Sequence, residues 1–144
     1  MFKKIAIALV LVFTLTLFAC DSGSKVEYPK KYGIVDVVAG EETKTGVKLT
    51  LETDGFGGTI KAEVTVVDGK IVDYDVIENS ESAGWGKALI EDGAILQAII
   101  DETENLDTFD VHDYLDAEAG ATVTGEALLE IALAALEHYA DDYE

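Results

Sequence analysis

Residues 59–76, TIKAEVTVVDGKIVDYDV, decide the fold class of this chain. Apolar side chains occupy every second position in the first half of this stretch and recur in its second half, and Asp68-Gly69 lies between the two halves. Such alternation is typical of half-buried strands, and a turn dipeptide between two of them predicts an antiparallel hairpin. Residues 47–52, VKLTLE, alternate in the same way and predict a third strand.

The apolar period also predicts the length of the hairpin loop. A two-residue loop over residues 68–69 would place Val64 opposite Asp73, and this puts aspartates on the apolar face. A three-residue loop over residues 67–69 keeps one face apolar and places Gly69 in the left-handed bulge position. We therefore predict the three-residue loop. Its pairs are Val66 with Lys70, Val64 with Val72, Ala62 with Tyr74, and Ile60 with Val76.

Two helices are expected after the strands. Residues 87–102 carry leucine and isoleucine at helical spacing, although Gly93 weakens this pattern. The last helix shows a clearer apolar stripe over residues 128–139, with Thr124 as its N-cap. Residues 105–119 between the helices are acidic and loop-like, with room for one helical turn. Strands followed by helices predict a small α+β domain, in which the helices pack on an antiparallel sheet.

The first twenty residues are typical of an export signal. Two lysines precede an apolar run over residues 5–18, and Ala19 and Cys20 follow. This order is that of a secretory signal peptide, and the run is shorter than the roughly 20 apolar residues of a spanning helix. The end of the run resembles the bacterial lipobox, which implies cleavage before Cys20 and acylation of its thiol. The alternative is an ordinary secreted protein with a spare thiol.

These segments divide the chain into three parts. They are a lipoprotein signal peptide (1–19), a polar lipid-anchored tether (20–32) and one domain (33–144). We expect the domain to lie on the extracytoplasmic side of the cell membrane. Without its signal the chain has 8 lysines and no arginine against 29 acidic residues, a formal charge of −21. This balance excludes nucleic acid as a partner, because phosphate binding relies on clustered basic side chains.

Three segments contain more glycine and hydroxyl groups than packing requires. Residues 54–58, DGFGG, form either a plain turn or a site where the backbone approaches a ligand closely. Residues 78–86, ENSESAGWG, contain the only tryptophan, Trp85, which either closes the core edge or stacks on a flat ligand. Residues 116–124, DAEAGATVT, precede the predicted last helix. They either cap this helix or use its N-terminal N–H groups to bind a phosphate.

In their order and spacing, these segments, together with VDGKI at residues 67–71, resemble the FMN-binding domain family over about residues 47–139. Relatives include the covalent-flavin subunits of the sodium-translocating NADH:quinone oxidoreductase and of a related electron-transfer complex, and stand-alone bacterial lipoproteins. The resemblance implies an FMN cofactor, which a flavin transferase joins through its phosphate to a threonine, here Thr122. It also implies that further residues belong to the FMN site. They are Asp116, Gly120 and Ala121 of the attachment motif, Glu81, Ser82, Gly84 and Gly86, and Gly57 and Gly58. Trp85 and Thr124 join the candidate site on their own chemistry, as an aromatic plane and as a hydroxyl group at the start of a helix. Two positions depart from the family pattern: Ala119 replaces a usual serine or threonine, and Ser82 replaces a threonine.

The resemblance predicts a carrier rather than an enzyme with its own substrate. Such a lipid-anchored flavoprotein would pass electrons between a membrane-linked donor and an extracytoplasmic acceptor. Two alternatives remain: a lipoprotein that binds FMN without a covalent bond, and a flavin-free lipoprotein that uses the same cleft for a ligand or protein. The only histidines, His112 and His138, are interpreted as structural, although His112 could lie near the site, and the acidic residues show no metal-binding spacing.

Overall fold

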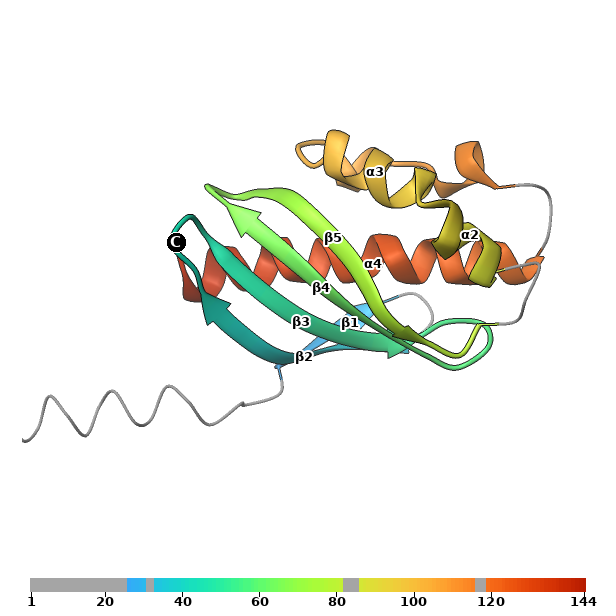
Figure 1. The fold of residues 1–144 in the computed structure, drawn as a ribbon, viewed down its shortest axis with the longest axis horizontal. Helices are drawn as coiled ribbons and strands as arrows, with labels where there is room; N and C mark the ends of the chain where they lie inside the picture. Colours follow the sequence, from blue (N-terminus) through green and yellow to red (C-terminus); the bar gives the residue numbers. More distant parts are fainter. Residues whose placement is uncertain (1–25, 31–32, 82–85, 116–118) are drawn as a thin grey trace, which may run out of the picture.

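The domain is an antiparallel sheet with a long helix laid along one face (Figure 1). This computed structural model describes residues 26–30, 33–81, 86–115 and 119–144. The strands are β1 (Val26–Lys30), β2 (Gly33–Glu42), β3 (Val47–Asp54), β4 (Thr59–Val67) and β5 (Lys70–Asn79), and they lie in the sheet in chain order. The helices are α2 (Gly86–Asp92), α3 (Ala94–Asp101) and α4 (Ala119–Asp142), with two short 3₁₀ turns, η1 (Leu106–Thr108) and η2 (Val111–Tyr114). The predicted α+β class is confirmed.

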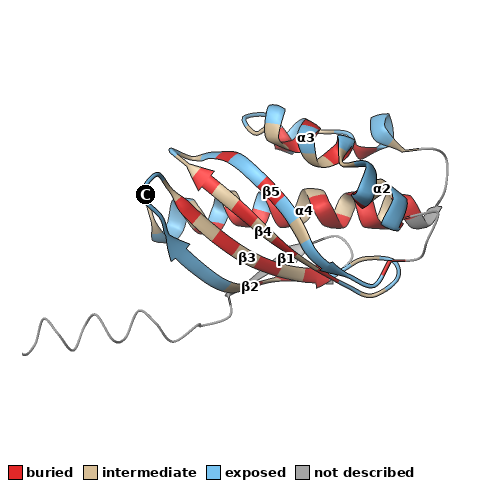
Figure 2. Ribbon diagram, in the orientation of Figure 1, coloured by how far each residue is buried: buried red, intermediate tan, exposed pale blue. Residues whose placement is uncertain are grey.

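The core lies between the sheet and α4 (Figure 2). Alternate side chains of β3 and β4 point inward and are buried, as the sequence period predicts. The apolar stripe of α4 covers them. Its fully buried members are Ala127, Leu128, Ile131, Ala132 and Ala135. Each large aliphatic side chain buried in this way contributes about 1.5–3 kcal/mol, so this interface fixes where α4 lies.

The β4–β5 hairpin has a shorter loop than predicted. Only Asp68 and Gly69 form the loop, with φ angles of 50° and 77°, and Val67 pairs with Lys70. Two successive positive φ angles are those of a type I′ turn, for which Asp-Gly is a favoured sequence. The predicted three-residue loop and its pairs are therefore wrong.

A β-bulge removes the conflict that had favoured the longer loop. Val66 pairs with Ile71, but the register then shifts so that Val64 lies opposite Tyr74, and Val72 becomes the extra residue. Ile71 and Tyr74 can then both face the core, whereas Val72 is 51% exposed. One inserted residue changes the face of every residue after it, and a strict period-two pattern cannot represent this.

Two strands precede those that were predicted. β1 pairs with β2, and β2 with β3, so residues 26–30 belong to the sheet rather than to the predicted tether over 20–32. The domain therefore begins at Val26 instead of residue 33. β1 was not predicted because it contains Pro29, which cannot donate a backbone hydrogen bond. β1 is an edge strand, however, and proline is tolerated there. The signal peptide and Cys20 lie outside the described residues.

The helices also differ from the prediction at their ends. The helix predicted over 87–102 is two helices, because Gly93 adopts a left-handed φ of 73° between them. α4 begins at Ala119, so Thr124 lies inside the helix and is not its N-cap. Residues 105–115 contain only the short turns η1 and η2, in keeping with the predicted loop-like segment and its helical turn, whereas Ala119 already belongs to α4. Within the described part of the chain, no helix is both long and apolar enough to cross a membrane.

Candidate functional site

The described parts of the three glycine- and hydroxyl-rich segments meet at one end of the sheet (Figure 1). Residues 54–58 form the turn between β3 and β4, which we call the 54–58 turn. Asn79 ends β5, Ser80 and Glu81 follow it, and Gly86 begins α2. The first turns of α4 lie beside α2 at the same end. Segments separated by more than 60 residues in sequence are therefore neighbours in space.

Glu81 lies at the centre of this meeting point. Its side chain is buried, with an exposed fraction of 7%. The backbone N–H of Gly57 donates a hydrogen bond to Oε2 of Glu81 at 3.1 Å. Oε1 is buried and has no hydrogen-bond partner among the residues that the structure describes. A buried oxygen that lacks a donor is costly, so Oε1 is the incomplete polar group of this region.

Three glycines lie beside Glu81, at positions where the Cβ of any other residue would come too close to neighbouring atoms. A Cβ on Gly55 would collide with Oε1, and a Cβ on Gly57 would lie 2.6 Å from the carbonyl oxygen of Ser80. A Cβ on Gly86 would collide with Oγ1 of Thr124 and lie 2.6 Å from Oε2 of Glu81. We call the group Gly55, Gly57, Glu81, Gly86 and Thr124 the Glu81 cradle.

Thr122 and Thr124 occupy the first turns of α4. Thr124 is fully buried, and Thr122, the fourth residue of the helix, is half-buried. The first four N–H groups of a helix lack intrahelical partners, and side chains lean back toward the helix N-terminus. The hydroxyl of Thr122 is therefore carried by the turn whose N–H groups have no acceptor within the helix, at the positive end of the helix dipole.

The predicted site residues divide into three groups. The structure brings Gly57, Glu81, Gly86 and Thr124 together in the cradle. Thr122, Gly120 and Ala121 lie in the first turn of α4, and Gly58 closes the 54–58 turn with a φ of 138°. Asp116, Ser82, Gly84, Trp85 and Cys20 lie outside the described residues. Gly55 was missed by the prediction, although it belongs to the glycine-rich stretch that drew attention to Gly57.

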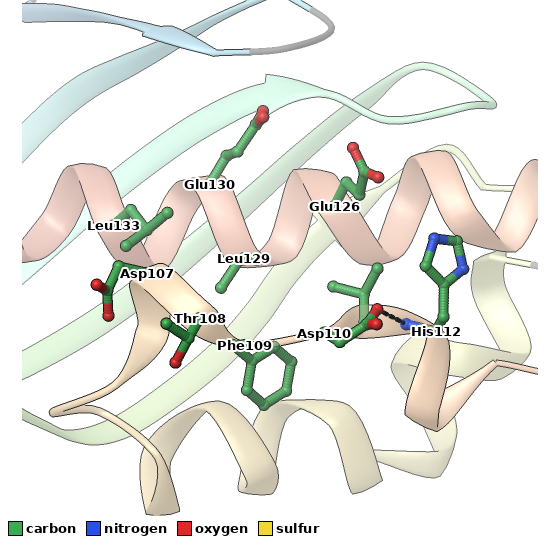
Figure 3. A pocket seen from close by; sticks show the side chains of 10 residues that line it. Asp107, Thr108, Phe109, Asp110, His112, Glu126, Leu129, Glu130 and Leu133 are labelled. Carbon is green, nitrogen blue, oxygen red and sulfur yellow. Dashed lines mark hydrogen bonds between the residues drawn. The ribbon is translucent and has the colours of Figure 1, made fainter.

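A cavity of about 370 Å³ lies between α4 and the η1–η2 segment (Figure 3). Its lining combines acidic and apolar side chains. The lining residues are Asp107, Thr108, Phe109, Asp110, Val111, His112, Glu126, Leu129, Glu130 and Leu133. Asp110 accepts a hydrogen bond from the N–H of His112 at 2.9 Å, drawn as a dashed line in Figure 3. Glu126 follows Thr122 by one helical turn, so the cavity adjoins the face of α4 that carries Thr122.

The shifted pKa values belong to residues outside the cradle. Burial raises the pKa of Tyr74 well above its usual value, and the Tyr74 hydroxyl donates a hydrogen bond to the carbonyl of Leu128 at 2.7 Å. A hydrogen bond from Lys70 lowers the pKa of the exposed Glu104. Among the described residues, no group of three or more His, Cys, Asp or Glu side chains is arranged to hold a metal ion.

The geometry fits FMN. Flavin N3–H and ribityl hydroxyl groups are donors of the kind that Oε1 of Glu81 lacks, and a phosphate suits the first turn of α4. No curated protein matched the chain. A family model described as FMN-binding domain matches residues 55–137, which is more than half of the chain and includes the whole cradle. The chain therefore belongs to the FMN-binding domain family, and its cofactor is FMN.

Proposed function

We propose that this protein is a lipid-anchored extracytoplasmic flavoprotein with FMN attached to Thr122 through a phosphoester. It would pass electrons between a membrane-linked donor and an extracytoplasmic acceptor. The observation that carries the proposal is the position of Thr122. Its half-buried side chain lies in the first turn of α4, two residues before the cradle residue Thr124.

Backbone groups suit the charge of the attached phosphate. The phosphodiester would keep one negative charge, and the chain contains no arginine to neutralise it. The unpaired N–H groups and the helix dipole at the start of α4 provide a binding site without a cationic side chain. Thr122 would supply the ester oxygen and lose its hydroxyl proton, while the flavin transferase breaks the pyrophosphate bond of a flavin dinucleotide donor, so that a nucleoside monophosphate leaves as the new bond to phosphorus forms.

The cradle would orient the rest of the cofactor. Oε1 of Glu81 is the acceptor available to a donor group of FMN, and the 54–58 turn brings backbone close to the same carboxylate. Bound FMN would supply the electron transfer itself, while the chain supplies position and hydrogen bonds. No acid–base residue is needed for this role, in keeping with a carrier rather than an enzyme.

The N-terminal sequence supports the membrane location. Two acyl chains on Cys20 and a third on its amine would bind firmly, since each buried methylene contributes about 0.8 kcal/mol. Five residues lie between Cys20 and β1, and a fully extended segment of this length spans at most roughly 20 Å. The domain would therefore remain close to the membrane surface and to a donor embedded in it.

Flavin fluorescence after denaturation tests the proposal. The full chain, with its export signal, is co-expressed with a flavin transferase, and the membrane fraction is run on a denaturing gel. We expect a fluorescent band for the wild type and for Thr50→Ala, a control at a half-buried position on β3, and no fluorescence for Thr122→Ala. A yellow native protein with a dark denatured band would instead show non-covalent FMN. A colourless protein in both states would contradict flavin binding altogether.

A further inference from the structure

We propose that Glu81 is a positioning residue that holds the FMN site in shape before FMN is attached. Its carboxylate ties the 54–58 turn to the start of α2 and to the first turns of α4, and so fixes the turn that carries Thr122. This inference deepens the proposed function and rests on it only for the measurement of flavin attachment.

The first link is the hydrogen bond from Gly57 to Glu81. It joins residues 24 positions apart, and it connects the β3–β4 turn to the segment that leaves β5. The N–H of Glu81 donates in turn to the side chain of Asn79 at 3.2 Å, which holds the residue at the end of its strand. The 54–58 turn is thus fixed by a side chain from outside the β3–β4 hairpin.

The second link is the close packing of glycines against the carboxylate. Gly55 has no positive φ angle, so its own backbone conformation does not require glycine. A Cβ at this position would instead collide with Oε1 of Glu81 and lie 2.6 Å from Cδ1 of Ile60, of which the carboxylate oxygen is the nearer. Gly86 is held between Oε2 of Glu81 and Oγ1 of Thr124 in the same way. In the sequence, Gly55 and Gly86 suggest close approach of a ligand to the backbone. In the structure, both leave space for the side chain of Glu81.

The third link reaches the acceptor. Thr124 is fully buried against Gly86, and Thr122 lies two residues earlier in the same rigid helix. A shift of Glu81 would therefore be transmitted through Gly86 and Thr124 to Thr122. Glu81 forms no ion pair among the described residues, and a buried carboxylate without a cation is costly. A residue needed only for core packing would be apolar, whereas this carboxylate makes contacts that an apolar side chain cannot.

A double-mutant cycle on the flavin-free full chain tests the packing. Gly55→Ala should lower the Tm by about 5–10 °C in the wild-type background and by clearly less in a Glu81→Ala background, because the colliding oxygen is gone and only Cδ1 of Ile60, the end of a flexible side chain 2.6 Å from the new Cβ, must still move. Gly57→Ala is the matched control. Its Cβ meets the backbone carbonyl of Ser80, so its cost should remain in both backgrounds. Equal costs of Gly55→Ala in the two backgrounds would overturn the inference.

Flavin attachment tests the positioning role. With Thr122 intact, Glu81→Ala should lower the attached fraction on the order of tenfold or more, measured well below its Tm. Glu81→Gln, whose amide oxygen can still accept the Gly57 N–H, should restore much of it. A variant destabilised at a distant site, such as Gly69→Ala, should attach flavin normally when it is assayed equally far below its own Tm. Normal attachment in Glu81→Ala would overturn the inference. If the wild type attaches no flavin, the proposed function fails, and the double-mutant cycle still decides the role of Glu81.

Discussion

Two polar side chains are buried beside α4, and they differ in how completely they are satisfied. Tyr74 donates its hydroxyl proton to the Leu128 carbonyl at 2.7 Å, so its one donor is paired. Glu81 accepts one hydrogen bond at Oε2 and, among the described residues, none at Oε1. Both side chains are more than 90% buried. Tyr74 thus contributes a fully paired polar group to the core, whereas Glu81 keeps one buried acceptor oxygen for which the described residues supply no donor.

Gly69 and Gly55 also differ, in the reason why each position requires glycine. Gly69 has a φ of 77°, and a Cβ there would meet nothing within 4 Å. It is needed for the conformation of its own turn. Gly55 has an ordinary φ, but its neighbour Glu81 leaves no space for a Cβ. Gly55 is therefore required by the residues around it, whereas Gly69 is required by its own backbone conformation.

The largest expected effect on stability comes from the core around Tyr74. Leu128→Ala removes a fully buried side chain between α4 and the sheet, and it should lower the free energy of unfolding by about 2–5 kcal/mol. Chemical denaturation measures this loss. Attachment of flavin at a temperature where the variant is folded should be unchanged. Loss of attachment in folded Leu128→Ala, with normal attachment in Glu81→Ala, would reverse the roles of the two regions.

The next effect is a loss of stability at alkaline pH. Burial raises the pKa of Tyr74, so the folded state keeps this proton when the unfolded chain releases it above about pH 10. The free energy of unfolding should therefore fall by about 1.4 kcal/mol per pH unit between pH 10 and the folded pKa. Denaturation curves of wild type and Tyr74→Phe at several pH values measure the difference in slope. Parallel slopes would show that Tyr74 ionises as easily in the folded protein as in the unfolded chain.

The smallest effect is at Gly69. Gly69→Ala places a Cβ in a left-handed conformation but in open space, so it should cost only about 1 kcal/mol of stability. Thermal unfolding measures it beside Gly55→Ala. A cost at Gly69 larger than that at Gly55 would break the distinction between the two glycines.

The sequence predicts the elements whose pattern is regular. Alternation in β3 and β4 and the stripe of α4 were enough to predict the core. The predicted hairpin loop was wrong because the bulge at Val72 changes which side chains of β5 face the core. The alternation of apolar residues does not reveal where a bulge lies. Helix propensity did not indicate that α4 begins at Ala119, because Gly120 and β-branched Thr122 weaken the pattern while tertiary packing favours the helix.

The candidate site was predicted only in part. The resemblance selected Glu81, Gly57 and Gly86, and the structure brings them together. Their spacing in sequence could not show that Gly55 and Gly86 both border one carboxylate, because this contact depends on how β3, β5 and α4 pack. The cavity beside α4 was missed for the same reason, since its lining comes from two separate segments.

Mass spectrometry of the peptide that contains Thr122 tests the central claim most directly. The full chain is exported in the presence of a flavin transferase, purified from membranes and digested. The account predicts that this peptide gains the mass of FMN less one water and that fragmentation assigns the gain to Thr122. An unmodified Thr122 in a yellow protein, or the same gain on Thr124, would contradict it.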